Sequence, residues 1–187
     1  LGKSRKVILG SSLRSATLRS EIGDTKMADK KLEARIQRLE DIEEIKQLKA
    51  RYCAACDDNH NPDRVAALFV EGGVWQSKGQ NYCDGHDQIK EFMGGIRNSG
   101  RIRNCAHMVF NPVIAVDGDT ANAHWRFQMM HTDHVPEDAL QYHRIIGYYE
   151  DQYVRRDGSW WFQELCVTVE ESAPYTVEEN LITDAEE

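Results

Sequence analysis

The sequence lacks long hydrophobic runs, and their absence excludes several classes of protein. No stretch approaches the roughly 18 consecutive apolar residues that a transmembrane helix requires. The apolar run Val7-Ile8-Leu9 is too short for the hydrophobic region of a secretory signal. There is also no phosphate-cradling glycine motif and no Gly-x-Ser-x-Gly nucleophile elbow. These absences argue against a membrane protein, a secreted precursor, a P-loop protein and an α/β hydrolase.

Positive charge is scarce, and so is cysteine. Asp and Glu number 31 against 23 Lys and Arg, which gives a formal net charge of −8. This balance disfavours nucleic acids and anionic membranes as general partners. The cysteine count is odd, at five, and the cysteines do not have the spacing of a secreted disulfide scaffold. We therefore expect reduced thiols and a cytoplasmic protein.

The charge is unevenly distributed along the chain, which indicates a domain boundary. Residues 1–26 hold six basic and two acidic residues, a net charge of +4, so the rest of the chain carries −12. The first segment reads as an expression leader or read-through before a natural start at Met27, a disordered tail, or an organellar targeting segment. We expect a folded domain over residues 27–175 and an acidic tail over residues 176–187.

Helical patterns fill the first part of that domain. Apolar residues recur every three or four positions from Leu32 to Tyr52, which predicts one long amphipathic helix capped at Asp29. A second helix is expected to begin at Pro62, with Asn61 as its cap, and to run to about Phe69. After a turn at residues 71–73 and a short strand at 74–77, a third helix follows residues 84–85 and ends at residues 94–95.

The second part of the domain has strand patterns joined by hairpin turns. Turns at residues 117–119 and 156–159 separate expected strands at 105–116, 120–130, 141–155 and 160–169. Residues 131–138 are expected to form a polar loop. Helices followed by hairpin-linked strands predict an α+β protein with helices covering one face of a curved antiparallel sheet.

Several of these segments resemble the SnoaL-like domains of the nuclear-transport-factor-2-like superfamily. The resemblance is carried by residues 32–52 of the first helix, by residues 105–121, which include Cys105-Ala106-His107-Met108, and by residues 147–160 near the end. The order resembles most closely the branch containing bile-acid 7α-dehydratase, scytalone dehydratase and lindane dehydrochlorinase. It implies a cone-shaped α+β barrel, no cofactor, and a homo-oligomer, either dimer or trimer.

The resemblance also implies which residues carry chemistry. In the dehydratase and dehydrochlorinase branches, an Asp near the end of the first helix orients a His on a central strand, and these positions match Asp57 and His107. A neutral imidazole oriented by a carboxylate is suited to taking a proton from a substrate. Tyr52 matches a Tyr that assists a leaving hydroxyl, although core packing explains it equally well. From spacing alone, Asp57 is as well explained as a solvated helix end.

Aromatic and apolar residues are expected to line a hydrophobic pocket. The candidates for substrate binding are Trp75, Phe110, Trp125, Phe127, Met129 and Tyr148. Arg144 is a candidate for an anionic substrate group, or it pairs with one of the surplus acids. The bile-acid branch has Asp, Arg and Tyr where Met129, Glu170 and Gln76-Ser77 stand here, so an acidic or CoA-linked steroid is not supported.

Two clusters suggest metal ligands, but neither supports a metal prediction. Cys53 and Cys56 lie near His60 in sequence but fall on an apolar helix face, and they lack the usual second pair of ligands. The expected loop after Met130 contains His131-Thr132-Asp133-His134, with His143 beyond it, and reads more simply as solvated. We expect no metal and no cofactor.

Two functions from different classes fit these observations. The first is a cofactor-independent lyase, dehydratase-like, or an isomerase acting on a hydrophobic ring compound such as a polyketide, steroid or terpenoid. The second is a non-catalytic small-molecule-binding or accessory subunit, as in the small subunit of ring-hydroxylating dioxygenases. The fold alone does not decide between them.

Overall fold

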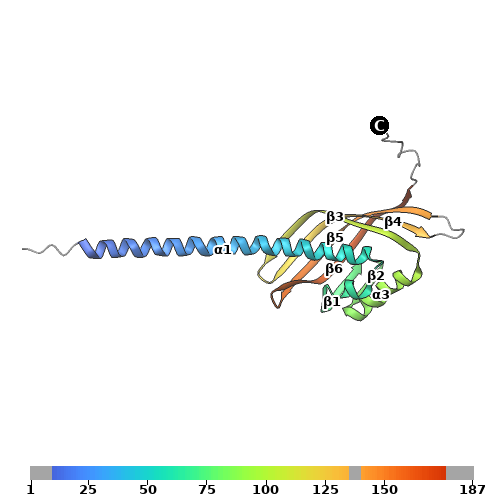
Figure 1. The fold of residues 1–187 in the computed structure, drawn as a ribbon, viewed down its shortest axis with the longest axis horizontal. Coiled ribbons are helices and arrows are strands. Elements are labelled where there is room, and N and C mark those ends of the chain that lie inside the picture. The colour runs from blue at the N-terminus through green and yellow to red at the C-terminus, as the bar shows by residue number, and fades with distance from the viewer. Residues whose placement is uncertain (1–9, 135–139, 176–187) are drawn as a thin grey trace, which may run out of the picture. The chain divides into compact units, whose positions relative to one another are not determined.

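The computed structural model describes residues 10–134 and 140–175, which form three helices and six strands (Figure 1). The helices are α1 (Gly10–Asp57), α2 (Pro62–Ala66) and α3 (Gly85–Ser99). The strands are β1 (Phe69–Ser77), β2 (Asn81–Asp84), β3 (Ile102–Asp117), β4 (Thr120–His134), β5 (Leu140–Arg156) and β6 (Ser159–Tyr175). The predicted α+β class is therefore correct.

The strands form one open sheet in the order β2-β1-β6-β5-β4-β3. Strands β3 to β6 are joined by consecutive antiparallel pairings, as the two predicted hairpin turns require. The sheet is mixed, because β1 pairs with β6 in parallel. In the chain, β2 and α3 lie between β1 and the antiparallel strands β3 to β6. In the sheet, β1 pairs with the edge of β6 that β5 does not occupy.

Helix α1 begins earlier than predicted, at Gly10, and the chain divides into two compact units at residues 41 and 42, within this helix. Asp29 is therefore not its cap, since the backbone is helical from Gly10 onward. The expected leader and acidic tail fall partly on residues 1–9 and 176–187, which lie outside the described residues. No helix in the described part of the chain is both long and apolar enough to span a bilayer.

The two short helices end at residues other than those predicted. Helix α2 has its expected cap, where the Asn61 side chain accepts a hydrogen bond from the backbone N–H of Arg64. It stops at Ala66, because Phe69 already pairs with β6. Helix α3 runs past Gly94 and Gly95 to Ser99 and ends at Gly100, whose positive φ of 61° suits glycine. Glycine weakens a helix by only about 1 kcal/mol, and packing of Ile89 and Met93 outweighs it.

The strands are longer than the sequence pattern predicted. Residues 71–73 were expected to form a turn but belong to β1, where the pairing with β6 shifts register between Phe69 and Val74. The polar loop expected at residues 131–138 does not begin at His131, since β4 continues to His134 and pairs with β5 throughout. Strand β6 likewise extends beyond Val169 to Tyr175. Cross-strand pairing, which local pattern does not report, sets these ends.

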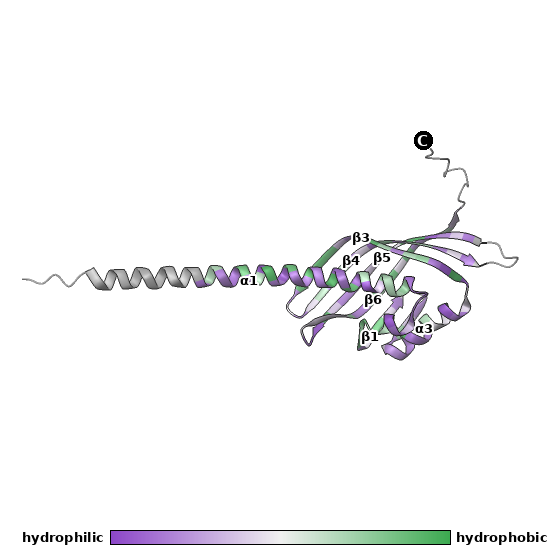
Figure 2. Ribbon diagram, in the orientation of Figure 1, coloured by the Kyte–Doolittle hydropathy of each residue, from purple (hydrophilic) through white to green (hydrophobic). Residues whose placement is uncertain are grey.

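The sheet has an inner face covered by helices and an outer face without such cover. Along β4, Ala123, Trp125, Phe127 and Met129 are buried, and the residues between them are exposed or half-buried, as the alternation predicted. Figure 2 shows the same mixture of hydrophilic and hydrophobic residues along the strands. Ile45, Leu48 and Tyr52 of α1 join this core. The inner face is therefore where enclosed chemistry can occur.

One charged pair is buried within this core. The Lys49 ammonium lies 2.8 Å from Oδ2 of Asp151, and both side chains are fully buried. It also lies 3.3 Å from the centre of the Tyr149 ring, and the Tyr153 hydroxyl donates to Asp151. Burial lowers the pKa of Lys49, and the Asp151 carboxylate opposes that shift. The pair fixes α1 against β5, although the sequence pattern placed Lys49 among surface residues.

Candidate functional site

The structure brings together the carboxylate and imidazole predicted to form the dyad. Asp57 is the last residue of α1, and His107 lies on β3 opposite Met129 of β4. The Asp57 Oδ1 atom is 2.7 Å from Nδ1 of His107, and the same carboxylate accepts the backbone N–H of His107. The His107 side chain is only 8% exposed, against 32% for Asp57. The carboxylate thus holds both the ring and its strand.

This contact determines which ring nitrogen is available for chemistry. An ionised carboxylate accepts hydrogen bonds only, so Nδ1 of His107 must carry the proton that lies toward Asp57. In the neutral ring, Nε2 then has the free lone pair. A general base and its orienting group would need this arrangement.

His60 is a third member of the site that the sequence analysis did not assign to it. Its ring lies edge-on to His107, with centroids 5.9 Å apart, and the residue is only 6% exposed. His60 has a positive φ of 48°, so the chain turns inward directly after α1. Burial first, and then the charge of a protonated His107, lower the pKa of His60 to about 4. A neutral His60 therefore adjoins the dyad at neutral pH.

The depressed pKa makes a prediction for the pH dependence of stability. The unfolded chain protonates His60 near pH 6.5 and the folded chain only near pH 4, so protons favour the unfolded state between these values. Stability contributed by neutral His60 is present above pH 6.5 and lost as the pH falls, by about 2 to 3 kcal/mol at pH 4.5. We expect His60→Asn, which tolerates the positive φ, to remove that loss.

Urea unfolding at pH 7.5 and pH 4.5 would measure this effect in the wild-type protein and the variant. His124→Asn is the matched control, because His124 is an exposed histidine on the outer face of β4. An equal loss of stability on acidification in wild-type protein and His60→Asn would contradict the assigned burial effect.

A cavity of about 620 Å³ opens on the inner face, lined by residues of α3 and of strands β3 to β6. Its apolar lining includes Phe92 and Ile96 of α3 and Ile145 of β5, and its polar lining includes His131 and His143. The residue His131 follows Met129, the partner of His107, by two positions, so His107 and His131 share this face. Asp57 lines a different, more polar hollow of about 550 Å³ with Arg97 and Asn104. Asp57 therefore lines the polar hollow, His131 and His143 line the apolar cavity, and Ile102 lines both.

Four of the predicted substrate-binding residues lie on the inner side but are built into the core. Trp75 packs against Phe92 with ring centroids 4.6 Å apart, and Phe127 packs against Tyr149. The Trp125 indole donates to Tyr153, and Met129 pairs with His107 and with Ile145. Of these four, Trp75 contacts Phe92, which lines the cavity, and Met129 is the cross-strand partner of His107.

Tyr52 is placed by the structure as a packing residue. It is 2% exposed, and its hydroxyl accepts a hydrogen bond of 2.9 Å from the Trp75 indole. Its ring contacts Tyr149 and Phe162 edge-on. The hydroxyl is thus held by Trp75 rather than by the dyad, which favours the packing interpretation over the assisting one.

Three predicted substrate-binding residues lie on the wrong face of the sheet. Phe110 pairs with Arg126 on the outer face and is 41% exposed. Tyr148 also pairs with Arg126, and its ring stacks on His124. Arg144 donates a hydrogen bond of 2.6 Å from Nη2 to Glu171, which is the expected alternative of pairing with one of the surplus acidic residues. The sequence pattern identified these side chains as aromatic or charged but did not fix the face to which they belong.

The comparisons with known proteins agree with this architecture. The sequence profile of the SnoaL-like domain matches residues 37–165. A protein assigned as a scytalone dehydratase from Novosphingobium aromaticivorans is 25% identical, with a TM-score of 0.65, covering 75% of this chain and 91% of that one. None of the curated proteins compared matches the chain.

Two further solved structures share the fold at lower identity. A hexachlorocyclohexane dehydrochlorinase from Novosphingobium barchaimii is 20% identical, with a TM-score of 0.66, covering 75% of this chain and 94% of that one. A protein assigned as an aromatic ring hydroxylase from Novosphingobium aromaticivorans is 22% identical, with a TM-score of 0.65, covering 73% and 94%. The fold is thus shared among proteins whose names describe different reactions.

Proposed function

This chain belongs to the SnoaL-like domain family, and on that basis we propose that it is a cofactor-independent lyase. It acts on a hydrophobic ring compound and eliminates water or another small leaving group, with His107 as general base. The observation that carries the proposal is the 2.7 Å contact between Asp57 and His107, with the histidine ring largely withdrawn from solvent.

The proposed step is a proton abstraction followed by elimination. The Nε2 lone pair of His107 takes a proton from a carbon of the substrate, and the electrons of the broken C–H bond form a C=C bond. The bond to the leaving group on the adjacent carbon breaks, and the leaving group keeps that electron pair. No electrons enter or leave the system, so the reaction needs no redox partner. The Asp57 carboxylate stabilises the imidazolium that forms on His107.

The cavity supports a small and mostly apolar substrate. Its side chains Phe92, Ile96 and Ile145 offer apolar contact, and His131 and His143 offer polar contact at one end. A ring compound bearing one or two oxygen or halogen substituents fits this distribution.

A substrate screen tests the proposal. The purified protein is incubated without cofactor with hydroxylated and chlorinated ring compounds, including scytalone and γ-hexachlorocyclohexane, and products are read by mass spectrometry. We expect loss of water or hydrogen chloride from at least one compound at a rate that His107→Ala abolishes. Retention of compounds without conversion would identify a binding module instead, and conversion that is unchanged in His107→Ala would contradict the proposed base.

A further inference from the structure

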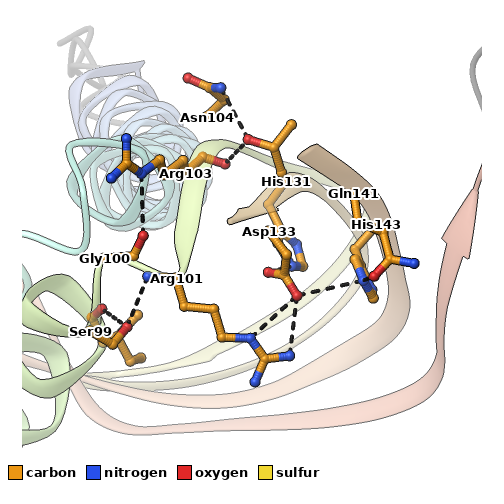
Figure 3. Close-up of polar contacts among 11 residues, drawn as sticks. Ser99, Gly100, Arg101, Arg103, Asn104, His131, Asp133, Gln141 and His143 are labelled. Atoms are coloured by element: carbon orange, nitrogen blue, oxygen red, sulfur yellow. Dashed lines mark hydrogen bonds and ion pairs between the residues drawn. The ribbon is translucent and has the colours of Figure 1, made fainter. Parts of the chain in front are cut away.

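A second group of side chains on the inner face has the chemistry of a metal site. His131 and Asp133 are two residues apart on β4 and so project to the same side of the sheet, and His143 on β5 is the direct partner of His131. Figure 3 shows the Asp133 side chain beside those of His131 and His143, with its carboxylate also facing Arg101. One ligand atom from each residue, a ring nitrogen or a carboxylate oxygen, lies within 4.8 Å of the other two.

The three side chains are buried and turned toward one another. The exposed fractions are 5% for His131, 4% for Asp133 and 17% for His143. Nε2 of His131 is 3.1 Å from Oδ1 of Asp133, and Nε2 of His143 is 3.5 Å from Oδ2. The imidazole rings stack with centroids 5.3 Å apart. The ring nitrogens thus converge on one carboxylate.

One buried nitrogen of this cluster, Nδ1 of His131, has no hydrogen-bond partner among the described residues. The buried Oδ1 of Asp133 has its contact with Nε2 of His131, at 3.1 Å, and makes no hydrogen bond to any other described residue. Burying a polar atom that lacks a partner is unfavourable, so a bound species that reached these atoms would stabilise the cluster.

An exposed arginine pairs with the carboxylate of this cluster. Arg101 donates from Nε and Nη2 to Oδ2 of Asp133, at 3.3 and 3.1 Å, whereas Oδ1 faces His131. Because the Arg101 side chain is 71% exposed, it can move away without unpacking the core. Nε2 of His143 also contacts the Gln141 side chain at 3.2 Å. Arg101 therefore provides the counter-charge that a cation would replace.

We infer that His131, Asp133 and His143 bind one divalent first-row transition-metal ion, for which Zn²⁺ is the representative. Two imidazoles and one carboxylate match the ligands of Zn²⁺ and its neighbours, whereas Mg²⁺ and Ca²⁺ prefer oxygen alone. Tetrahedral bonds of about 2.1 Å separate ligands by about 3.4 Å, which is close to the 3.1 and 3.5 Å between the two ring nitrogens and the carboxylate oxygens. Three protein ligands leave a coordination position for a water or for a ligand oxygen from the cavity that these residues line. This inference does not depend on the proposed elimination.

The test is metal binding to the full chain, purified without a histidine tag and stripped with a chelator. Titration calorimetry with Zn²⁺ and optical titration with Co²⁺ are expected to show one site of micromolar or tighter affinity. His143→Gln and Asp133→Asn should each weaken binding at least about tenfold. His124→Gln, which removes a histidine from the outer face of the same strand, should leave binding unchanged. Circular dichroism confirms that each variant is folded, and His143→Gln alters the more accessible ring.

Three outcomes would overturn the inference. The first is no saturable binding in the micromolar range, which would leave the cluster as a set of hydrogen bonds around Asp133. The second is binding that both variants retain at full strength. The third is a thiolate-to-cobalt charge-transfer band, which would place the ion on cysteines instead. Because binding is measured without substrate, its failure is independent of the elimination activity.

Discussion

Replacing His107 by alanine is expected to lower turnover at least a hundredfold on any substrate that the screen identifies. The His107 ring is held by Asp57 through Nδ1. It lies on the same face of the sheet as His131, which lines the cavity. General base catalysis by a positioned histidine contributes roughly 10²- to 10⁴-fold. The measurement is steady-state kinetics, in which kcat should fall more than the affinity for substrate.

Asp57→Asn is expected to have a comparable effect for a different reason. The asparagine amide keeps one oxygen for the backbone N–H of His107 but can present an N–H to Nδ1 where the carboxylate accepted a hydrogen bond. That change favours the tautomer with the proton on Nε2, and a protonated Nε2 cannot act as a base. The matched control is Asp58→Asn, since Asp58 is the next residue and pairs with Arg64 at the surface. We expect the control to stay within about twofold of wild type, because surface changes away from the site are near neutral.

Removal of Lys49 is expected to have the largest effect on stability. Lys49→Met leaves the fully buried Asp151 carboxylate without its cation, and breaking a buried pair in this way costs about 3 to 5 kcal/mol. Replacing both members, as in Lys49→Met with Asp151→Leu, should recover much of the loss, because the double variant removes both buried charges. Urea unfolding at neutral pH measures the free energies of unfolding.

The control for this prediction lies one turn earlier on the same helix. Lys46→Met removes an exposed lysine that lies 3.6 Å from Glu43 and is expected to change stability by less than about 0.5 kcal/mol. A loss below about 1 kcal/mol for Lys49→Met would show that the pair is replaced by solvent or by other contacts, contrary to the structure.

Local patterns in the sequence predicted the elements better than the contacts between them. Periodicity placed Ile45, Leu48 and Tyr52 on one helix face, and alternation placed Trp125 and Phe127 on one strand face, as the structure confirms. These signals depend on neighbouring residues alone. The parallel pairing of β1 with β6 depends on where an edge strand finds a partner, which no local pattern reports.

The residues of the site show the same difference between local patterns and long-range contacts. Lys49 and Asp151 are 102 residues apart, and nothing near either residue indicates a buried pair. His131 and Asp133 read as loop residues because they are polar, and only the pairing of β4 with β5 makes them buried. The contact between Asp57 and His107 was anticipated from the family resemblance and not from spacing. His60 could have been found only by knowing that the chain turns inward after α1.

The central claim is that Asp57 and His107 act as one unit, and a double-variant cycle tests it most directly. Turnover is measured for wild type, Asp57→Asn, His107→Ala and the variant carrying both changes, on one substrate. If the carboxylate works only through the ring, the double variant will be about as slow as His107→Ala alone. Losses that multiply in the double variant, or wild-type turnover in Asp57→Asn, would contradict the account.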